Sequence, residues 1–476
     1  MNYQELHEKL KLPYFIVFAL ISLSALFFLY SGKNLIFIAL FSIPVLLIAL
    51  IYFEKYFIYY FIVTLFLKNY LFWDLRIMPV SLISYAMIFF FITAYDSGYF
   101  SKLSLPKTVR NSAVILIIAV FVSEINSPHV SFQSVYFGFI MLSMILTFYV
   151  VFRTIKTTEN LEKLLNFFVF FTFITGVLII LQIIYTGRLR SFVYAGIGFA
   201  DYCAFAMITL VFSYFIFGKP KLKIYIIFGV ISIVIVTSLT RTMWISLAVS
   251  LVYGLIISTL YDKDRRAFIK QKFSFFVFVS IIVIILFIAF GLFNIITSRL
   301  SDFSTNLFQF DSDSETLVSN SLESRIFIWI VAGNAFLSNP VTGVGYLMFS
   351  EVSSNYNILP DFIFDIFVKN LDAHTTYLNF LTETGIVGFL SFITFLVIIY
   401  RLTFKSIKLS KTISEKKVSV ILNIYLFFII LHSIYSGAFT LAQIAYLLYY
   451  LLALAVANYS ILKYKYLEKD FTTNLN

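Results

Sequence analysis

The chain has few charged residues and a single cysteine, and both features limit the classes of protein to which it can belong. Charged residues make up 12% of the 476 positions, hydrophobic residues make up 61%, and the mean hydropathy is +0.95. A water-soluble globule cannot bury so much apolar side chain, so a lipid bilayer must solvate most of the chain. The lone cysteine, Cys203, excludes a disulfide within the chain and is predicted to be an inert buried thiol.

The motifs of common cofactor sites are missing as well. The sequence has no CxxC pair, no Walker loop and no GxGxxG fingerprint, so nothing indicates a zinc, nucleotide or flavin site. The net charge of +11 is explained by membrane topology and does not indicate nucleic-acid binding. We therefore predict no metal, no cofactor and no nucleic-acid partner.

Long apolar runs fill most of the chain. A membrane-spanning helix needs roughly 20 mostly apolar residues, and such runs recur with short polar breaks from end to end. The predicted fold class is all-α, a polytopic transmembrane helical bundle of about 12 to 14 spans. The predicted spans are residues 13–30, 35–53, 56–72, 77–95, 111–126, 132–152, 164–185, 201–217, 224–239, 243–260, 273–293, 376–400, 420–436 and 440–460.

Basic residues gather in alternate loops, which predicts the orientation. Placing the N-terminus in the cytoplasm assigns 26 of the 35 Lys and Arg residues to one side, and short basic loops stay cytoplasmic. An even number of spans then leaves both termini in the cytoplasm. The first segment, 13–30, lacks a small-residue cleavage site and is predicted to be a retained span.

One connection is far longer than the others. Residues 294–375 form an acidic loop on the predicted outer face, between about eleven spans in 1–293 and about three in 376–476. A structureless loop of this length is improbable, so it should contain short helices. "SLESRIFIWIVAGNAFLSNPVTGVG" predicts one, with a capping box of Asn320 and Glu323 and an end at "NP" followed by a glycine turn. This helix is too short to span and is predicted to lie at the outer interface.

His374 stands where this loop re-enters the membrane, in "DAHTTYLNFLTETGIVGFL". At 100° per residue, Gly385 and Gly388 would share one helix stripe with His374, and glycine on a stripe allows close approach of a helix or lipid chain. A free imidazole has a pKa of about 6.5, so a largely neutral ring can accept a proton from a hydroxyl. The alternative is an interfacial histidine that only hydrogen-bonds a neighbouring helix.

Three segments resemble motifs of the O-antigen ligase and O-antigen polymerase superfamily. "HTTYLNFLTETGIVG" is similar to its His and Gly-x-x-Gly signature, and "SRIFIWIVAGNAFLSNPVTGVG" to the Arg, Trp, Asn-Pro and Gly-x-Gly block before it. "TSLTRTMWIS" resembles the Arg motif between two earlier spans. The motifs occur in family order over about residues 185–400, with the longest outer loop in the family's place. "AGIGFADYCAF" departs from the family, which more often has an Asn-containing turn there.

The resemblance implies glycan transfer at the outer face of a bacterial cytoplasmic membrane. The donor would be a glycan on undecaprenyl pyrophosphate, the partner an acceptor glycan, and neither a metal nor a nucleotide sugar would be needed. His374 and Arg325 would be catalytic, and Arg241 and Arg325 would bind the pyrophosphate, with Arg188 and Arg190 as further candidates. Guanidinium groups suit this task because they bind phosphate oxygens in bidentate fashion. For each arginine the alternative is a helix-end anchor or a surface ion pair.

Other polar residues are predicted to be structural. Glu383, nine residues after His374, would lie on the opposite helix face as a buried polar contact, while His129 and His432 match no motif.

We predict a polysaccharide polymerase that extends a carrier-linked repeat unit, acting with membrane lipids, a chain-length regulator and a flippase. A ligase that transfers the glycan to lipid A core uses the same donor and remains open. A flippase or secondary transporter is less well supported, because the sequence shows no repeated half and its polar residues concentrate at one outer loop.

Overall fold

A computed structural model describes residues 103–128, 130, 132–186, 196–238, 240–261, 321–437 and 442–468. Every regular element in these ranges is a helix, which confirms the all-α class. The long helices are α5 (Lys107–Asn126), α6 (Phe132–Thr154), α7 (Thr158–Thr186), α8 (Gly196–Leu210), α9 (Leu222–Thr237), α10 (Arg241–Tyr261), α13 (Ser321–Ser338), α16 (Thr376–Leu409), α17 (Ile413–His432) and α18 (Ala442–Lys463). The short ones are α14 (Phe349–Val352), α15 (Asp361–Phe367), the 3-10 helix η4 (Ser353–Tyr356) and the π-helical turns η2 (Val211–Ile216) and η5 (Tyr464–Glu468).

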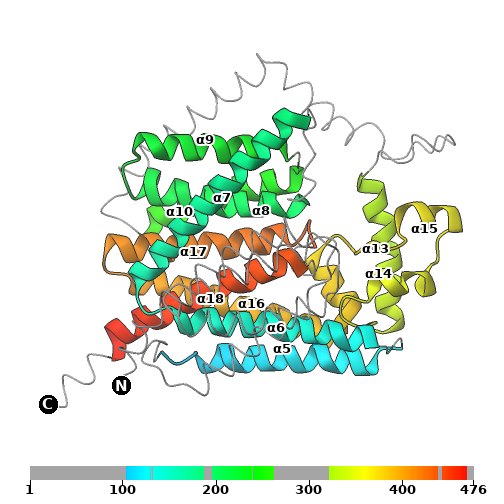
Figure 1. Cartoon of the computed structure of the whole chain (residues 1–476). Coiled ribbons are helices and arrows are strands. Elements are labelled where there is room, and N and C mark those ends of the chain that lie inside the picture. The colour runs from blue at the N-terminus through cyan, green and yellow to red at the C-terminus, as the bar shows by residue number, and fades with distance from the viewer. Residues whose placement is uncertain are drawn as a thin grey trace, which may run out of the picture.

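Most of the long helices lie side by side in one bundle, and α13 runs across its end (Figure 1). We call the end that carries α13, α14 and α15 the loop end. The α5–α6 turn lies there, because the Ser127 hydroxyl donates to the Val344 carbonyl at 2.6 Å. The α17–α18 turn lies there too, because Arg325 Nη1 donates to the Tyr435 carbonyl at 3.3 Å. Successive bundle helices therefore alternate in direction.

Seven of the described helical segments are long and apolar enough to cross a bilayer, so the protein is a multi-pass membrane protein. They fall in α5, α6, α7, α8 with η2, α10, α16 and α18 with η5. Two further predicted spans, 224–239 and 420–436, correspond to α9 and α17, which are also helices. The other five predicted spans, 13–30, 35–53, 56–72, 77–95 and 273–293, lie outside the described residues. The total of 12 to 14 spans stays a prediction.

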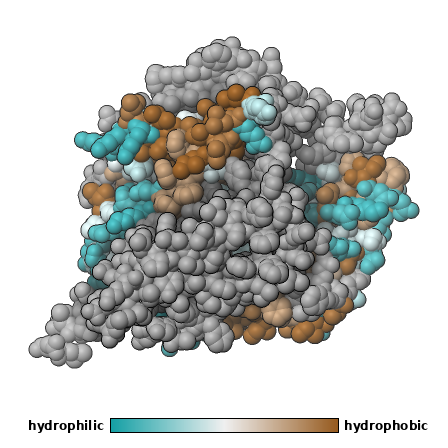
Figure 2. Space-filling model, in the orientation of Figure 1, coloured by the Kyte–Doolittle hydropathy of each residue, from teal (hydrophilic) through white to brown (hydrophobic). Residues whose placement is uncertain are grey.

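The bundle has a buried centre and an apolar exterior. Helices α8 and α18 are almost wholly enclosed, as expected for helices that are apolar on every side. Cys203, in α8, is fully buried, as predicted. On the outside of α5, α7 and α9 large apolar side chains are exposed, among them Ile118, Leu181 and Ile226. Figure 2 shows hydrophobic surface over the α7 and α9 side, with hydrophilic residues towards its ends, the pattern of a surface that faces lipid.

Basic residues are distributed unequally between the two ends. We call the end opposite the loop end the basic end, because most described Lys and Arg residues near helix termini lie there: Lys107, Arg110, Arg153, Lys156, Lys163, Lys219, Lys221, Lys223, Arg401, Lys405, Lys408, Lys411, Lys416, Lys417, Lys463 and Lys465. The loop end has Arg325 and Lys369, and α10 begins there at Arg241.

Residues 321–375 form a lobe with a small core of its own. Apolar side chains of α13, α14 and α15 pack together, including Ile328, Val331, Phe349 and Phe364. The predicted helix in this segment is α13, and it ends at Ser338 before Asn339 and Pro340. The capping box predicted for Asn320 and Glu323 lies outside the described residues and side chains.

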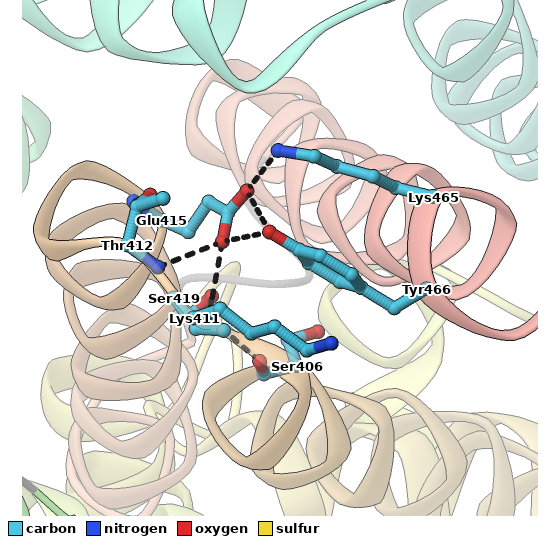
Figure 3. A network of polar contacts seen from close by, with 8 residues as sticks. Ser406, Lys411, Thr412, Glu415, Ser419, Lys465 and Tyr466 are labelled. Atoms are coloured by element: carbon cyan, nitrogen blue, oxygen red, sulfur yellow. Dashed lines mark hydrogen bonds and ion pairs between the residues drawn. The ribbon is translucent and has the colours of Figure 1, made fainter.

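At the basic end, the start of α17 is held by a polar network around Glu415 (Figure 3). The Thr412 hydroxyl and the Glu415 carboxyl form a capping box. Lys465 Nζ donates to Glu415 Oε1 at 2.6 Å, and the Tyr466 hydroxyl lies 2.9 Å from both carboxyl oxygens. Glu415 therefore joins α17 to the end of the chain's last described helix.

Glu415, outside the predicted span 420–436, should make stability depend on acidity. Burial alone would raise the pKa of this carboxyl, but Lys465 and the backbone amides of Thr412 and Lys411 outweigh burial and lower the pKa to about 2. The contribution to stability is complete above the ordinary pKa of 4.5 and is lost as the pH falls towards 2. Glu415→Gln should cost about 1 to 3 kcal/mol at pH 7, measured by thermal unfolding in detergent, with the two proteins converging towards pH 2. Asp365→Asn, which removes the exposed pair with Lys369, is the control and should change little. A gap that stays constant with pH would contradict this account.

Candidate functional site

Helix α13 directs two side chains at the segment that precedes α16. Arg325 and Trp329 lie one helical turn apart, so they share a face. Trp329 Nε1 donates to the Ala373 carbonyl at 3.0 Å, and Arg325 lies close enough to Asp372 for the two charges to interact. The helix that carries the predicted catalytic arginine thus contacts the segment 372–374 directly.

His374 and Asp372 form a hydrogen-bonded pair. Nδ1 of the imidazole lies 2.7 Å from Oδ1 of the carboxylate, and the histidine side chain is 39% exposed. Asn379 holds the pair from inside the helix: its Oδ1 accepts from the Ala373 backbone N–H at 2.7 Å, and its Nδ2 donates to Asp372 at 3.3 Å. With Nδ1–H donating to Asp372, Nε2 keeps its lone pair on a ring that is partly exposed.

The charged groups of this site influence one another's pKa. Burial alone would raise the pKa of Asp372, but hydrogen bonds from His374 and Asn379 outweigh it and hold the pKa below its ordinary value. Burial lowers the pKa of Arg325, and the charge of Asp372 opposes that shift. Asp372 is therefore an anion at neutral pH that faces both a guanidinium and an imidazole.

His374 is not part of the helix that follows it. Its φ angle is +52°, in the left-handed region that non-glycine residues rarely adopt, and α16 begins only at Thr376. Such strained positions cluster at functional sites. The predicted stripe of His374, Gly385 and Gly388 on one helix is therefore wrong at its first member.

Gly385 overturns the rest of that stripe. With φ +62° and ψ −170° it breaks α16, and hydrogen bonds connect this break to the glycine turn after α13. The Val344 and Gly345 amides donate to the Thr382 and Glu383 carbonyls at 3.1 and 2.9 Å, and the Ile386 amide donates to the Pro340 carbonyl at 2.9 Å. What approaches the glycine closely is thus neither a helix nor a lipid but the backbone of residues 340–345.

Beneath this turn lie two buried acids, Glu124 of α5 and Glu383 of α16. Both oxygens of Glu124, Oε2 of Glu383 and the Tyr346 hydroxyl have no hydrogen-bond partner among the described residues. Glu383 is buried as predicted, but it faces the turn and Glu124.

The remaining predicted site residues are only partly described. Arg241 is the first residue of α10, so its backbone lies at the loop end, and its side chain is outside the described set. Arg188, Arg190 and His129 lie outside the described residues. The structure thus brings Arg325 and His374 together through Asp372, and the role of each predicted residue stays a prediction.

Sequence reasoning missed Asp372 as the partner of His374. The spacing i, i+2 in a non-helical segment was an available signal, because such side chains project to the same side. It also predicted His432 to be structural but named no partner, and the structure pairs its ring with Asp201 of α8, 231 positions earlier.

Residues 226–393 match the family described as Wzy_C, O-antigen ligase. The matched region contains Arg241, Arg325, His374 and Gly385. The match covers about a third of the chain and supports its resemblance to the O-antigen ligase and polymerase superfamily. No curated protein matches it. The site at the start of α16 lies within the matched region, so the match supports an activity of the O-antigen ligase and polymerase type.

Proposed function

We propose that the protein is a polysaccharide polymerase. It transfers a glycan chain from undecaprenyl pyrophosphate to a carrier-linked repeat unit on the outer face of the bacterial cytoplasmic membrane. The observation that carries the proposal is the meeting of Arg325 and His374 at Asp372, at the end of the bundle that has few basic residues. Short basic loops stay in the cytoplasm, so the loop end is assigned to the outside and both termini to the cytoplasm.

In the proposed reaction His374 is the general base. Its Nε2 accepts the proton of an acceptor sugar hydroxyl while that oxygen attacks the anomeric carbon of the donor. The bond between the anomeric carbon and the pyrophosphate oxygen breaks, and the carrier leaves as its pyrophosphate anion. Asp372 keeps Nδ1 protonated and stabilises the imidazolium, which then releases its proton to the outer solvent.

Arg325 and Arg241 are proposed to hold the departing pyrophosphate, with Arg188 and Arg190 as further candidates. Guanidinium groups neutralise the negative charge that grows on the leaving group, so the proposal needs no metal. Displacement in one step inverts the anomeric centre. A covalent glycosyl intermediate would need a carboxylate free to attack the sugar. Glu124 and Glu383 are too deeply buried for that, and Asp372 is held by His374 and Asn379.

Reconstitution distinguishes the candidate activities. The purified protein in lipid vesicles, supplied with carrier-linked repeat units, should produce a ladder of longer carrier-linked glycans on a gel. Elongation only when lipid A core is added would make the protein a ligase. Translocation of the carrier without elongation would make it a transporter. Adding a chain-length regulator should change the length distribution, and a flippase should supply substrate to the outer leaflet.

Asp372→Asn tests how His374 is held. The amide has no charge to keep Nδ1 protonated, so we expect the transfer rate to fall at least about tenfold, which corresponds to about 1.4 kcal/mol. The KM for the acceptor should change little, because Asp372 is not proposed to contact it. Asp365→Asn, on the same lobe but in an exposed pair, is the matched control. Equal rates for wild type and Asp372→Asn would remove Asp372 from the mechanism.

A further inference from the structure

A second polar centre lies inside the bundle at the loop end. His432 of α17 contacts two other helices: its Nε2 lies 3.1 Å from Oδ1 of Asp201 in α8, and its Nδ1 lies 3.3 Å from the hydroxyl of Ser246 in α10. All three side chains are buried. Ionisable side chains within membrane spans are costly, and their retention points to a role. The family resemblance assigns no role to His432, while Ser246 ends the Arg motif and Asp201 lies in the segment that departs from the family.

Packing alone does not fix the position of His432. A cavity of about 10 Å³ borders the ring, lined by Asp201, Phe205, Phe428 and Ser433, together with aliphatic side chains. Phe428 stacks on the imidazole at 5.3 Å, which holds the plane of the ring but does not distinguish the two orientations related by a 180° flip about the Cβ–Cγ bond. The hydrogen bonds to Asp201 and Ser246 therefore determine where the ring points.

The chain runs directly from His432 into the turn that supports the proposed transfer site. The Tyr435 amide donates to the His432 carbonyl at 3.0 Å and closes this turn. The backbone carbonyls of the turn 433–436 accept hydrogen bonds from α13 and from the start of α16, the two elements that carry the site. Ser433 accepts from the Thr375 hydroxyl at 3.2 Å, Tyr435 from Arg325 at 3.3 Å, and Ser436 from the Thr376 hydroxyl at 2.8 Å.

Both halves of the site therefore depend on this turn. Thr375 follows His374 in the chain, and Arg325 is the guanidinium that faces Asp372. A rotation of His432 that moves the 433–436 carbonyls changes the distance between the imidazole and the guanidinium, although His432 touches neither.

We propose that Asp201, His432 and Ser246 are positioning residues that set the geometry of the transfer site through the turn 433–436. The proposal rests on the proposed function for its catalytic consequence. Its structural consequence, that the 372–374 segment moves when the centre is altered, is independent of that function.

Tyr425 provides a matched control. It lies about two turns earlier on α17 and, like His432, connects α17 to α8, because its hydroxyl donates to the Phe205 carbonyl at 3.0 Å. Tyr425→Phe removes a buried contact between the same two helices without touching the turn. If the Asp201–His432 pair only holds α17 against α8, its loss and Tyr425→Phe should disturb the transfer site to a similar extent. If the pair positions the site, only substitutions of Asp201 or His432 should disturb it.

The first measurement needs no activity. Trp329 donates to Ala373 and is one of three tryptophans in the chain. The protein labelled with 5-fluorotryptophan gives a Trp329 resonance in ¹⁹F NMR, assigned with Trp329→Phe. Asp201→Asn and His432→Gln should shift it, and Tyr425→Phe should leave it in place. An unchanged resonance in both Asp201→Asn and His432→Gln, or an equal shift in Tyr425→Phe, overturns the proposal.

The second measurement uses reconstituted elongation. Asp201→Asn and His432→Gln should lower kcat about tenfold with KM for the carrier-linked acceptor within twofold, and Ser246→Ala about threefold. The midpoint of the pH profile should stay that of the wild type. Loss of the acid limb in His432→Gln would make His432 itself a proton acceptor and overturn the positioning role. Absence of elongation in the wild type refutes the proposed function, and the ¹⁹F result then decides the inference by itself.

Discussion

His374→Ala should stop chain elongation while the protein remains folded. A positioned general base contributes about 10² to 10⁴ in rate, and alanine leaves no group at this place to accept the hydroxyl proton. The side chain is 39% exposed and its partner Asp372 stays bound to Asn379, so little stability is lost. The expected result is carrier-linked single repeats with no ladder, at wild-type amounts of membrane-inserted protein and an unchanged thermal transition.

Lys369→Ala is the appropriate control, since Lys369 lies on the same lobe in an exposed pair with Asp365. It should elongate normally, because exposed pairs of this kind contribute roughly 0 to 1 kcal/mol. Long chains at near-normal amounts from His374→Ala would refute the assignment of the base. The reaction would then need another proton acceptor, and Arg325 would remain only as a binder of the leaving group.

Gly385→Ala should be among the most damaging single substitutions in the described chain. The glycine has φ +62° and ψ −170°, a combination that is almost restricted to glycine, and a Cβ there would lie 2.2 Å from the Val341 carbonyl oxygen. Either the break in α16 or the backbone pairing with residues 340–345 must give way. We expect a loss of at least about 3 kcal/mol, seen as a large fall in the thermal transition or as failure to accumulate in the membrane.

Substitutions of two other glycines provide a comparison for the expected loss of stability in Gly385→Ala. Gly333→Ala on α13 meets open space and should be neutral or stabilising by about 0.5 to 1 kcal/mol, because alanine favours a helix interior. Gly388→Ala would place its Cβ 2.3 Å from Thr384 Cβ, an atom that side-chain rotation does not move, so this substitution should also be destabilising. A thermal transition of Gly385→Ala equal to that of Gly333→Ala would show that the break in α16 is not needed.

Helix positions were predictable because bilayer-crossing segments carry their signal locally. The predicted span 376–400 corresponds to α16, and the helix before Asn339 and Pro340 corresponds to α13, since apolar length and terminating residues suffice for both. The break at Gly385 was not predictable in this way. The apolar pattern continues through it, and the backbone that requires the break lies some 40 positions earlier.

In the candidate site, too, some features could be predicted from the sequence and others could not. The family motifs pointed to His374 and Arg325, and an Asp two positions before His374 was visible in the sequence. That Arg325 lies near Asp372, and that His432 pairs with Asp201, depends on how α13 crosses the bundle and how α8 packs on α17. Contacts of this kind join residues too far apart in sequence for any periodic pattern to show them.

The backbone pairing at Gly385 also constrains how the protein is made. The Ser123 hydroxyl of α5 donates to the Glu383 carbonyl, which is 260 positions later, at 2.7 Å, and the neighbouring acid Glu124 lies against Gly345 in the turn before α16. During synthesis these contacts of α5 therefore form only after nearly the whole chain has left the ribosome. Ribosome-bound chains that end before residue 382 should thus be more susceptible to membrane proteases than the full-length chain, and completion of α16 should remove the difference.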